Sequence, residues 1–287
     1  MPTIALLLLL ASPALAQVTG HADYLYWQAN SSDFRFRKAN PYVPDYDGLA
    51  AQHDGSSGVR TGIGYRFHKW EVSWNFTYYA SDARDEWEGW FIDSDQGGTS
   101  NDDLDYQVHD FQITRSFCVG QCCELGVFGG FRWGQVDRHA QDDWIDGIAY
   151  PYFVYYDTSI SKTDSYGGRL GGNFRVQLTD SLSWFATGAF SGLVSTTEKN
   201  SFEVTNIVGG DMASMYEQAN SQRDTHETHS VEAATGLSWT HGSLELAAGY
   251  EWHVWSNIIH RRRIHVGYED YRDLVLDGLF ARVALTY

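Results

Sequence analysis

The stretch GLFARVALTY, residues 278–287, alternates between two kinds of side chain. Its apolar face is formed by Leu279, Ala281, Val283, Leu285 and Tyr287. The residues between them form the other face, which carries Arg282 near its middle. Because successive side chains of a strand point to opposite sides, this pattern predicts a β-strand with one apolar side. A strand of this kind that ends on an aromatic residue is typical of the closing strand of an outer-membrane β-barrel.

The same two-residue period recurs at residues 58–68, where Val59 and Ile63 alternate with Arg60 and Arg66. A bilayer admits only helices or closed barrels, because an unpaired backbone group in hydrocarbon is very costly. We therefore expect an all-β fold, a transmembrane antiparallel up-and-down β-barrel. Its strands should turn apolar side chains to lipid and polar or small side chains to the lumen.

Residues 1–16 are expected to be a signal peptide, and residues 17–287 the barrel. Residues 4–11 are apolar but too few to span a bilayer as a helix. The sequence Ala-Leu-Ala at 14–16 is a small-x-small cleavage site that would leave Gln17 at the start of the mature chain. The segment departs from the usual pattern because no Lys or Arg precedes the apolar run. Export combined with a barrel predicts the bacterial outer membrane as the location.

Aromatic residues make up 15% of the chain, yet the mean hydropathy is only −0.38. A membrane barrel explains both values, because only every second strand residue meets lipid and Trp and Tyr gather at the interfaces. A soluble β-sandwich also alternates, but it has little reason to place so many Tyr and Trp outward. The net charge of −17 argues against nucleic acid as a partner, because nucleic-acid-binding surfaces are basic.

The pattern predicts ten strands joined alternately by short turns and long loops. The predicted strands are 21–29, 58–68, 70–80, 104–117, 124–137, 164–178, 182–195, 230–240, 244–256 and 271–287. The predicted long loops are 30–57, 81–103, 138–163, 196–229 and 257–270. In bacterial barrels short turns face the periplasm and long loops face outside, and strand counts are even. Twelve strands are the alternative, if residues 34–42 or 148–156 extend into a hairpin.

The alternation also assigns side chains to the lumen. The charged positions expected there are Arg60, Arg66, Glu71, Glu124, Arg132, Arg169, Arg175, Glu232, Glu245, Glu251 and Arg282. Both signs occur in similar number, and a ten-stranded barrel has a narrow interior that side chains largely fill. Opposite charges confined there should pair, because an unpaired buried charge is costly. We therefore expect a salt-bridged lumen with at most a narrow water path.

Several segments resemble the Legionella-type major outer membrane protein family, which is described as pore-forming. The similar segments are ADYLYW at 22–27, GGFRW at 129–133, GGRLG at 167–171, AGYEW at 248–252 and LDGLFARV at 276–283. They keep the family's order and are spread over nearly the whole mature chain. The resemblance implies a barrel in the outer membrane and pore formation, and it brings no catalytic residues with it. The long loops, including the acidic one, resemble no known motif, so the resemblance assigns them no function.

Cys118, Cys122 and Cys123 lie together at a predicted periplasmic turn. Exported proteins meet an oxidising compartment, and three cysteines cannot all pair within one chain. One internal disulfide with one free thiol, a disulfide-linked dimer, and thiols without a role all remain open. A metal site is not expected, because the nearest histidine, His109, lies on the flanking strand and no fourth ligand is evident.

Two loop regions carry further chemistry-bearing residues. His226 and His229, together with Asp103 and Asp105, are the residue types found in omptin proteases, which are also ten-stranded barrels; the wider omptin pattern is missing.

Residues 81–105 carry nine carboxylates against Arg84 alone, which favours a solvated loop or a cation-collecting rim.

Arg261, Arg262 and Arg263, flanked by His260 and His265, form a basic cluster. Such a cluster suits lipopolysaccharide phosphates, the acidic loop or solvent.

The sequence thus predicts an integral outer-membrane barrel that forms a narrow porin-like pore for small solutes or ions. A non-conducting barrel acting in envelope structure or adhesion through its loops is the alternative, and an omptin-like protease is a remote one. We expect no enzyme activity, cofactor or metal. The expected partners are outer-membrane lipid and lipopolysaccharide, small solutes or ions, and a second copy in a disulfide-linked or non-covalent homo-oligomer.

Overall fold

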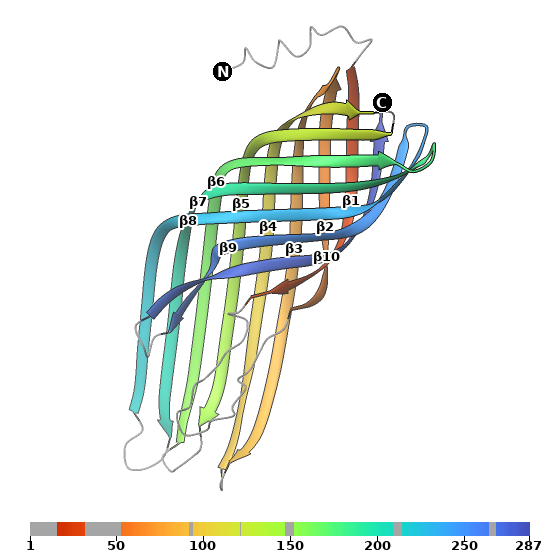
Figure 1. The fold of residues 1–287 in the computed structure, drawn as a ribbon. Coiled ribbons are helices and arrows are strands. Elements are labelled where there is room, and N and C mark those ends of the chain that lie inside the picture. Colours follow the sequence, from red (N-terminus) through yellow and green to blue (C-terminus); the bar gives the residue numbers. More distant parts are fainter. Residues whose placement is uncertain are drawn as a thin grey trace.

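The computed structural model is a single closed barrel of ten antiparallel strands (Figure 1). It describes residues 16–31, 53–91, 94–120, 122–146, 152–208, 214–263 and 268–287. The predicted signal peptide lies outside these residues except for Ala16, where the first strand begins. No helix among the described residues is long and apolar enough to cross a membrane.

Each strand pairs with its neighbours in sequence, and the first pairs with the last to close the sheet. The strands are β1 (Ala16–Asn30), β2 (His53–Phe67), β3 (Trp70–Phe91), β4 (Ser94–Val119), β5 (Cys123–Asp146), β6 (Tyr152–Gln177), β7 (Leu182–Val208), β8 (Ser214–His241), β9 (Leu244–Arg263) and β10 (Tyr268–Thr286). The predicted fold class and strand number are confirmed, and the twelve-strand alternative is wrong because the barrel closes with ten. Of the two segments proposed to add a hairpin, 34–42 lies outside the described residues.

Three of the predicted long loops are mostly strand instead. Segments 81–103, 138–163 and 196–229 extend the hairpins β3–β4, β5–β6 and β7–β8, which reach well beyond the other strands at the lower end of Figure 1. The prediction failed there because it required one apolar face. Beyond the bilayer the outer face of a strand meets water, so both faces can be polar and the alternation disappears while the backbone pairing continues.

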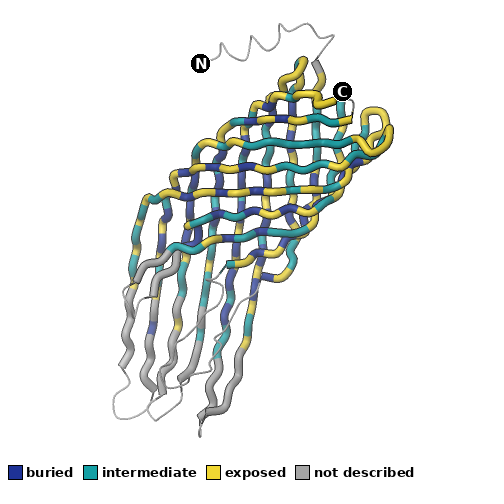
Figure 2. The backbone as a smooth tube through the Cα atoms, viewed as in Figure 1, coloured by how far each residue is buried: buried dark blue, intermediate teal, exposed yellow. Residues whose placement is uncertain are grey.

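The part of the barrel next to the short turns spans the membrane. Large apolar side chains of this part point outward, with Ile63 55%, Phe111 52% and Leu279 59% exposed. Their alternation with covered residues is visible along each strand in Figure 2. A wall that presents apolar side chains to its surroundings over this length suits the hydrocarbon of a bilayer.

Three phenylalanines lie inside the barrel against glycines of the neighbouring strand. Phe185 is paired with Gly236, Phe280 with Gly249, and Phe128 with Gly171. A β-carbon added at Gly249 would stand 2.2 Å from the carbonyl oxygen of Thr235 and 2.9 Å from the Phe280 ring. The missing side chain lets the sheet bend sharply and lets the ring cover the exposed backbone.

We expect Gly249→Ala to lower the free energy of unfolding by about 1–3 kcal/mol, because the added methyl group cannot be accommodated without a backbone shift. Gly192→Ala is the matched control, since it lies on the outer face and a β-carbon there meets nothing within 4 Å. Heat-modifiable migration on gels, followed over temperature, measures both. Equal midpoints for the two variants would contradict the close approach at Gly249.

Candidate functional site

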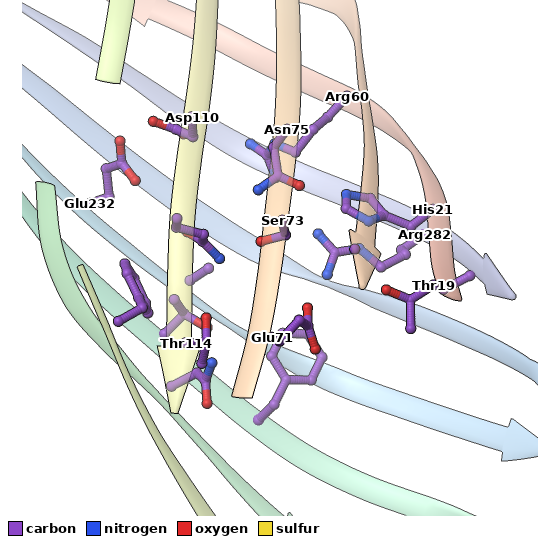
Figure 3. A pocket seen from close by; sticks show the side chains of 18 of the residues that line it. Thr19, His21, Arg60, Glu71, Ser73, Asn75, Asp110, Thr114, Glu232 and Arg282 are labelled. Carbon is purple, nitrogen blue, oxygen red and sulfur yellow. The ribbon is translucent and has the colours of Figure 1, made fainter. Parts of the chain in front are cut away.

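The lumen contains a cavity of about 400 Å³, which we call the vestibule. Its walls come from the membrane-spanning parts of the strands, and Figure 3 shows Ser73, Asn75 and Thr114 directed into it together with charged side chains. Arg66, near the short turns, has a side chain 47% exposed, whereas that of Arg132 in mid-barrel is 2% exposed. The vestibule is therefore open toward the short-turn end and closed toward the barrel centre.

All the charged residues that the sequence assigned to the lumen line this vestibule. They are Arg60, Arg66, Glu71, Glu124, Arg132, Arg169, Arg175, Glu232, Glu245, Glu251 and Arg282. Ten of them make ion pairs with one another or with an aspartate. Glu124 has no ion pair among the described residues and lies beside Arg175 in the β5–β6 register.

Deep in the vestibule, Arg132 joins three strands. Its Nε and Nη2 donate to the two oxygens of Asp110, each over 2.7 Å, and its Nη1 donates to Ser230 over 3.1 Å and to Glu232. Glu232 also accepts a hydrogen bond from Arg169, whose Nη1 donates to Gln112 over 2.8 Å. Because β5 and β8 are not neighbours in the sheet, the Arg132–Glu232 pair crosses the lumen.

A second group of charges lies on the opposite side. Arg282 donates to both oxygens of Asp23 over 2.7 Å. Arg60 donates to Asp23 over 3.3 Å and to the two oxygens of Glu251 over 3.0 and 3.2 Å. Glu251 also accepts a hydrogen bond from Trp27 Nε1 over 3.0 Å.

His253 stands between the two groups, with Nδ1 3.6 Å from Glu232 and Nε2 3.5 Å from Glu251. We call the two groups together with His253 the charged belt. Its four arginines face four carboxylates, so the belt is close to neutral when His253 is neutral.

Pairs nearer the short-turn end are more exposed. Arg66 binds Glu71 over 2.7 Å, and Arg175 binds Glu245 over 2.8 Å, with side chains 23–47% exposed. Exposed ion pairs of this kind contribute little to stability, typically about 0–1 kcal/mol each.

On the side of the charged belt that faces the extended hairpins, the lumen is filled by apolar and aromatic side chains, which we call the aromatic plug. Trp27, Tyr79, Tyr106 and Trp255 form its centre, and each is at most 1% exposed. The indole Nε1 of Trp255 donates to the Tyr106 hydroxyl over 3.1 Å, and the Tyr79 hydroxyl donates to the Trp27 carbonyl over 3.2 Å. Buried aliphatic residues surround them: Leu25, Leu104, Val108, Val136, Leu193, Ile258, Ile259, Leu274 and Leu276.

The sequence pattern did not predict Asp23, Asp110, His253 or the plug as parts of the site. Asp23 shares a face with Trp27, and Asp110 shares one with Tyr106, so strand parity could have placed them inside. They were overlooked because these strands carry apolar residues on both faces. The rule of an apolar outside and a polar inside fails where the lumen itself is packed.

The histidines and aspartates considered for a protease site do not lie together in the structure. The Asp103 carboxylate is 61% exposed on the outer surface, 3.9 Å from His139, and Asp105 accepts a hydrogen bond from Tyr78 there. His226 faces the inside instead, hydrogen-bonds the Asn257 carbonyl through Nε2 over 2.8 Å, and packs against the Tyr271 ring at a tilt of 36°. Its burial lowers the pKa of His226.

His229 lies on the outer face of β8, where it stacks on Phe190. Among these residues, neither histidine is therefore placed to act as a base at hydrogen-bond range of Asp103 and Asp105.

One carboxylate of the acidic segment is buried inside the extended hairpins. Asp102 accepts hydrogen bonds from Arg138 over 2.6–3.0 Å, and His53 Nε2 lies 3.8 Å away. Burial alone would raise the pKa of Asp102, but the Arg138 guanidinium outweighs it and holds the pKa below its ordinary value. The pair therefore stabilises this region at neutral pH, and that contribution is lost as the pH falls through the lowered pKa.

Asp82 and Asp103 are exposed on the outer face, as expected for a solvated segment. The basic cluster Arg261, Arg262 and Arg263 ends β9, and its side chains, like those of His260 and His265, lie outside the described part. Among the described residues no group of histidine, cysteine, aspartate and glutamate could hold a metal ion.

The three cysteines lie at the β4–β5 turn as free thiols, with the sulfurs of Cys122 and Cys123 3.6 Å apart. Cys118 is exposed at the end of β4. A disulfide requires about 2.05 Å between sulfurs, so pairing at this turn needs a local backbone change or a second chain.

In protein taken from the oxidising envelope, we expect fewer than three thiols to be alkylated, because thiols this close exchange readily into disulfides. Non-reducing gels should show an internally bridged monomer or a linked dimer, and the triple variant Cys118→Ser/Cys122→Ser/Cys123→Ser should show neither. Three alkylated thiols in the unreduced protein would contradict this.

A closed ten-stranded barrel with a lipid-facing apolar wall defines an integral outer-membrane β-barrel protein of the bacterial envelope. The chain belongs to the family of the Legionella pneumophila major outer membrane protein precursor, whose family model matches residues 16–287. The resemblance drawn from the sequence and the predicted location in the outer membrane are thereby confirmed.

Among solved structures, the outer membrane protease OmpT from Escherichia coli is similar in fold, with a TM-score of 0.51 and 10% identity over 96% of this chain and 97% of that one. Neisserial surface protein A matches with a TM-score of 0.32 and 11% identity, covering 93% and 96% of the two chains. Ail of Yersinia pestis matches with a TM-score of 0.28 and 11% identity, covering 94% and 99%. At these identities the likeness to OmpT concerns the fold alone. No curated protein matches the sequence.

Proposed function

We propose that this protein is a non-enzymatic outer-membrane barrel whose lumen is closed at rest and which acts through its extended hairpins outside the membrane. The observation that carries the proposal is the aromatic plug, where Trp27 and Trp255 are fully buried in mid-lumen. A water-filled pore would leave such side chains exposed along its wall. Their burial supports a packed, dry layer across the barrel.

Two layers in series support the closed state. An ion that entered the vestibule would first meet the charged belt, in which the Arg132 side chain is 2% exposed. It would then have to lose its hydration water to cross the aromatic plug, and an unpaired ion in an apolar layer is very costly. Either layer alone opposes conduction.

The hairpins β3–β4, β5–β6 and β7–β8 supply the outward surface for such a role. Their outer faces carry charged side chains of both signs, including Asp82, Arg84, Lys162 and Arg223. Lipopolysaccharide headgroups and proteins of a neighbouring surface are the partners that we propose for them. A second copy of the chain is a further proposed partner.

A narrow pore for small solutes or ions is the second candidate. It is favoured by the vestibule of about 400 Å³, which already occupies part of the route through the membrane. If the protein is a pore, the aromatic plug is a gate that opens in response to a signal, and the closed conformation is one of two conformations.

Planar-bilayer recording of the purified full chain tests the proposal. We expect insertions without stepwise current in high salt. Stable steps of uniform size in every insertion would overturn the closed-lumen proposal and support the pore. A known porin recorded in the same membranes is the control for insertion and detection.

A further inference from the structure

We propose that the vestibule is a carbohydrate-binding site, which a neutral saccharide enters from the short-turn end to lie between a wall of neutral hydrogen-bonding groups and the ring of Phe185. This inference does not depend on whether the barrel conducts. Because short turns face the periplasm in bacterial barrels, the site would sample periplasmic saccharides.

The vestibule has the size and the access that a small-molecule site requires. A cavity of about 400 Å³ lies within the range of small-molecule sites. Side chains near the short turns are partly exposed, as the 40% exposure of Arg175 and the 47% exposure of Arg66 indicate, so a solute can approach from that end. The aromatic plug closes the other end, which makes the vestibule a pocket.

Nearly all the charges lining the vestibule are already paired, and Glu124 is the exception among the described residues. Each of its six arginines lies within ion-pair distance of a carboxylate. An anionic ligand would have to compete with these internal carboxylates, and a cationic ligand with the arginines. The described charge arrangement therefore favours a neutral ligand.

Neutral side chains with unused hydrogen-bonding groups also line the vestibule. Ser73, Asn75 and Thr114 line the vestibule on the adjacent strands β3 and β4, and Figure 3 shows them on one side of it. No other described residue hydrogen-bonds their side chains. Ser73 is only 7% exposed, and its hydroxyl is buried without a partner. Such a group loses free energy unless water or a ligand in the cavity bonds to it.

An apolar surface lies across the vestibule from these groups. Phe185 of β7 lines it, is only partly buried, and is backed by Phe280 at a ring-centroid distance of 6.1 Å. Its pairing with Gly236 holds the ring against the wall. A sugar ring has hydroxyl groups around its edge and apolar C–H groups on its faces. It therefore matches a pocket with hydroxyl and amide groups on one side and an aromatic ring on the other.

Saturation-transfer NMR and calorimetry on the full chain test this, with maltose and diacetylchitobiose as probes. The micelles must be of an amine oxide detergent, because sugar-headed detergents would compete. We expect at least one probe to bind, and Phe185→Leu to weaken its binding about tenfold or more. Ser73→Ala should weaken it less, and it removes no internal hydrogen bond.

Phe190→Leu is the matched control, because Phe190 lies on the same strand and is 52% exposed on the lipid-facing side. It should bind the probe as the unchanged protein does. Heat-modifiable migration verifies that each variant is folded. Absence of binding for both probes, or equal affinity of Phe185→Leu and Phe190→Leu, would overturn the proposal. Preferential binding of inorganic phosphate or spermine would overturn the assignment to a neutral ligand.

Discussion

Replacing Arg132 by alanine should lower the free energy of unfolding by about 3–5 kcal/mol, the cost typical of removing one partner from a buried ion pair. Arg132 is 2% exposed and is the only described cation that binds Asp110 through two nitrogens at 2.7 Å. Its removal leaves Asp110 and Glu232 confined in the barrel, each without its nearest partner. The measurement is the midpoint of heat-modifiable migration, supported by reversible urea unfolding in lipid.

Two comparisons separate the loss of charge pairing from a general loss of packing. Arg175→Ala removes a guanidinium whose side chain is 40% exposed, so we expect a change of at most about 1 kcal/mol. The double variant Arg132→Met/Asp110→Asn removes one charge of each sign, leaves Glu232 paired with Arg169, and should recover part of the loss. An Arg132→Ala protein as stable as Arg175→Ala would mean that the belt does not hold the barrel together.

The double variant Trp27→Ala/Trp255→Ala should convert a silent barrel into one that passes current in planar bilayers. Both indoles are fully buried in mid-lumen, and removing two large side chains from a close-packed interior leaves a void there. Water entering the space would replace the dry layer. The charged belt still narrows the path, so the expected steps are small and noisy.

The same variant should also be less stable, because each Trp→Ala change in a packed interior costs about 3–5 kcal/mol. Trp184→Ala/Trp252→Ala is the control: it removes two indoles that are 37% and 41% exposed on the outside. That protein should stay silent. If the plug variant is folded and equally silent, the aromatic plug is not the barrier to ions.

The alternation along single strands was enough to predict much of the fold. Leu279 and Arg282 differ by an odd number of positions, so one must face lipid and the other the lumen once the segment is a strand. Leu279 is 59% exposed, and Arg282 binds Asp23 inside. The short turns and the number of strands followed from the same pattern. The hairpin extensions did not, because paired strands outside the bilayer need no apolar face.

The odd or even position of a residue in its strand determines which face of the sheet it occupies. It does not determine how deep in the barrel the residue lies or which residue lies across the lumen. Arg132 and Glu232 are 100 positions apart on strands that are not neighbours. They meet only because the closed sheet brings β5 and β8 to the same height. For the same reason Trp27 of β1 and Trp255 of β9 could not be recognised as parts of one plug.

The sequence by itself therefore determined the class of fold, the membrane as its surroundings and the inward or outward direction of most side chains. These are local properties, set by the two-residue period of a strand and by the difference between lipid and water. Closure of the barrel decided the rest. The pairing within the charged belt, the aromatic plug on its hairpin side and the vestibule on its short-turn side depend on strand register summed around ten strands, which no single segment encodes.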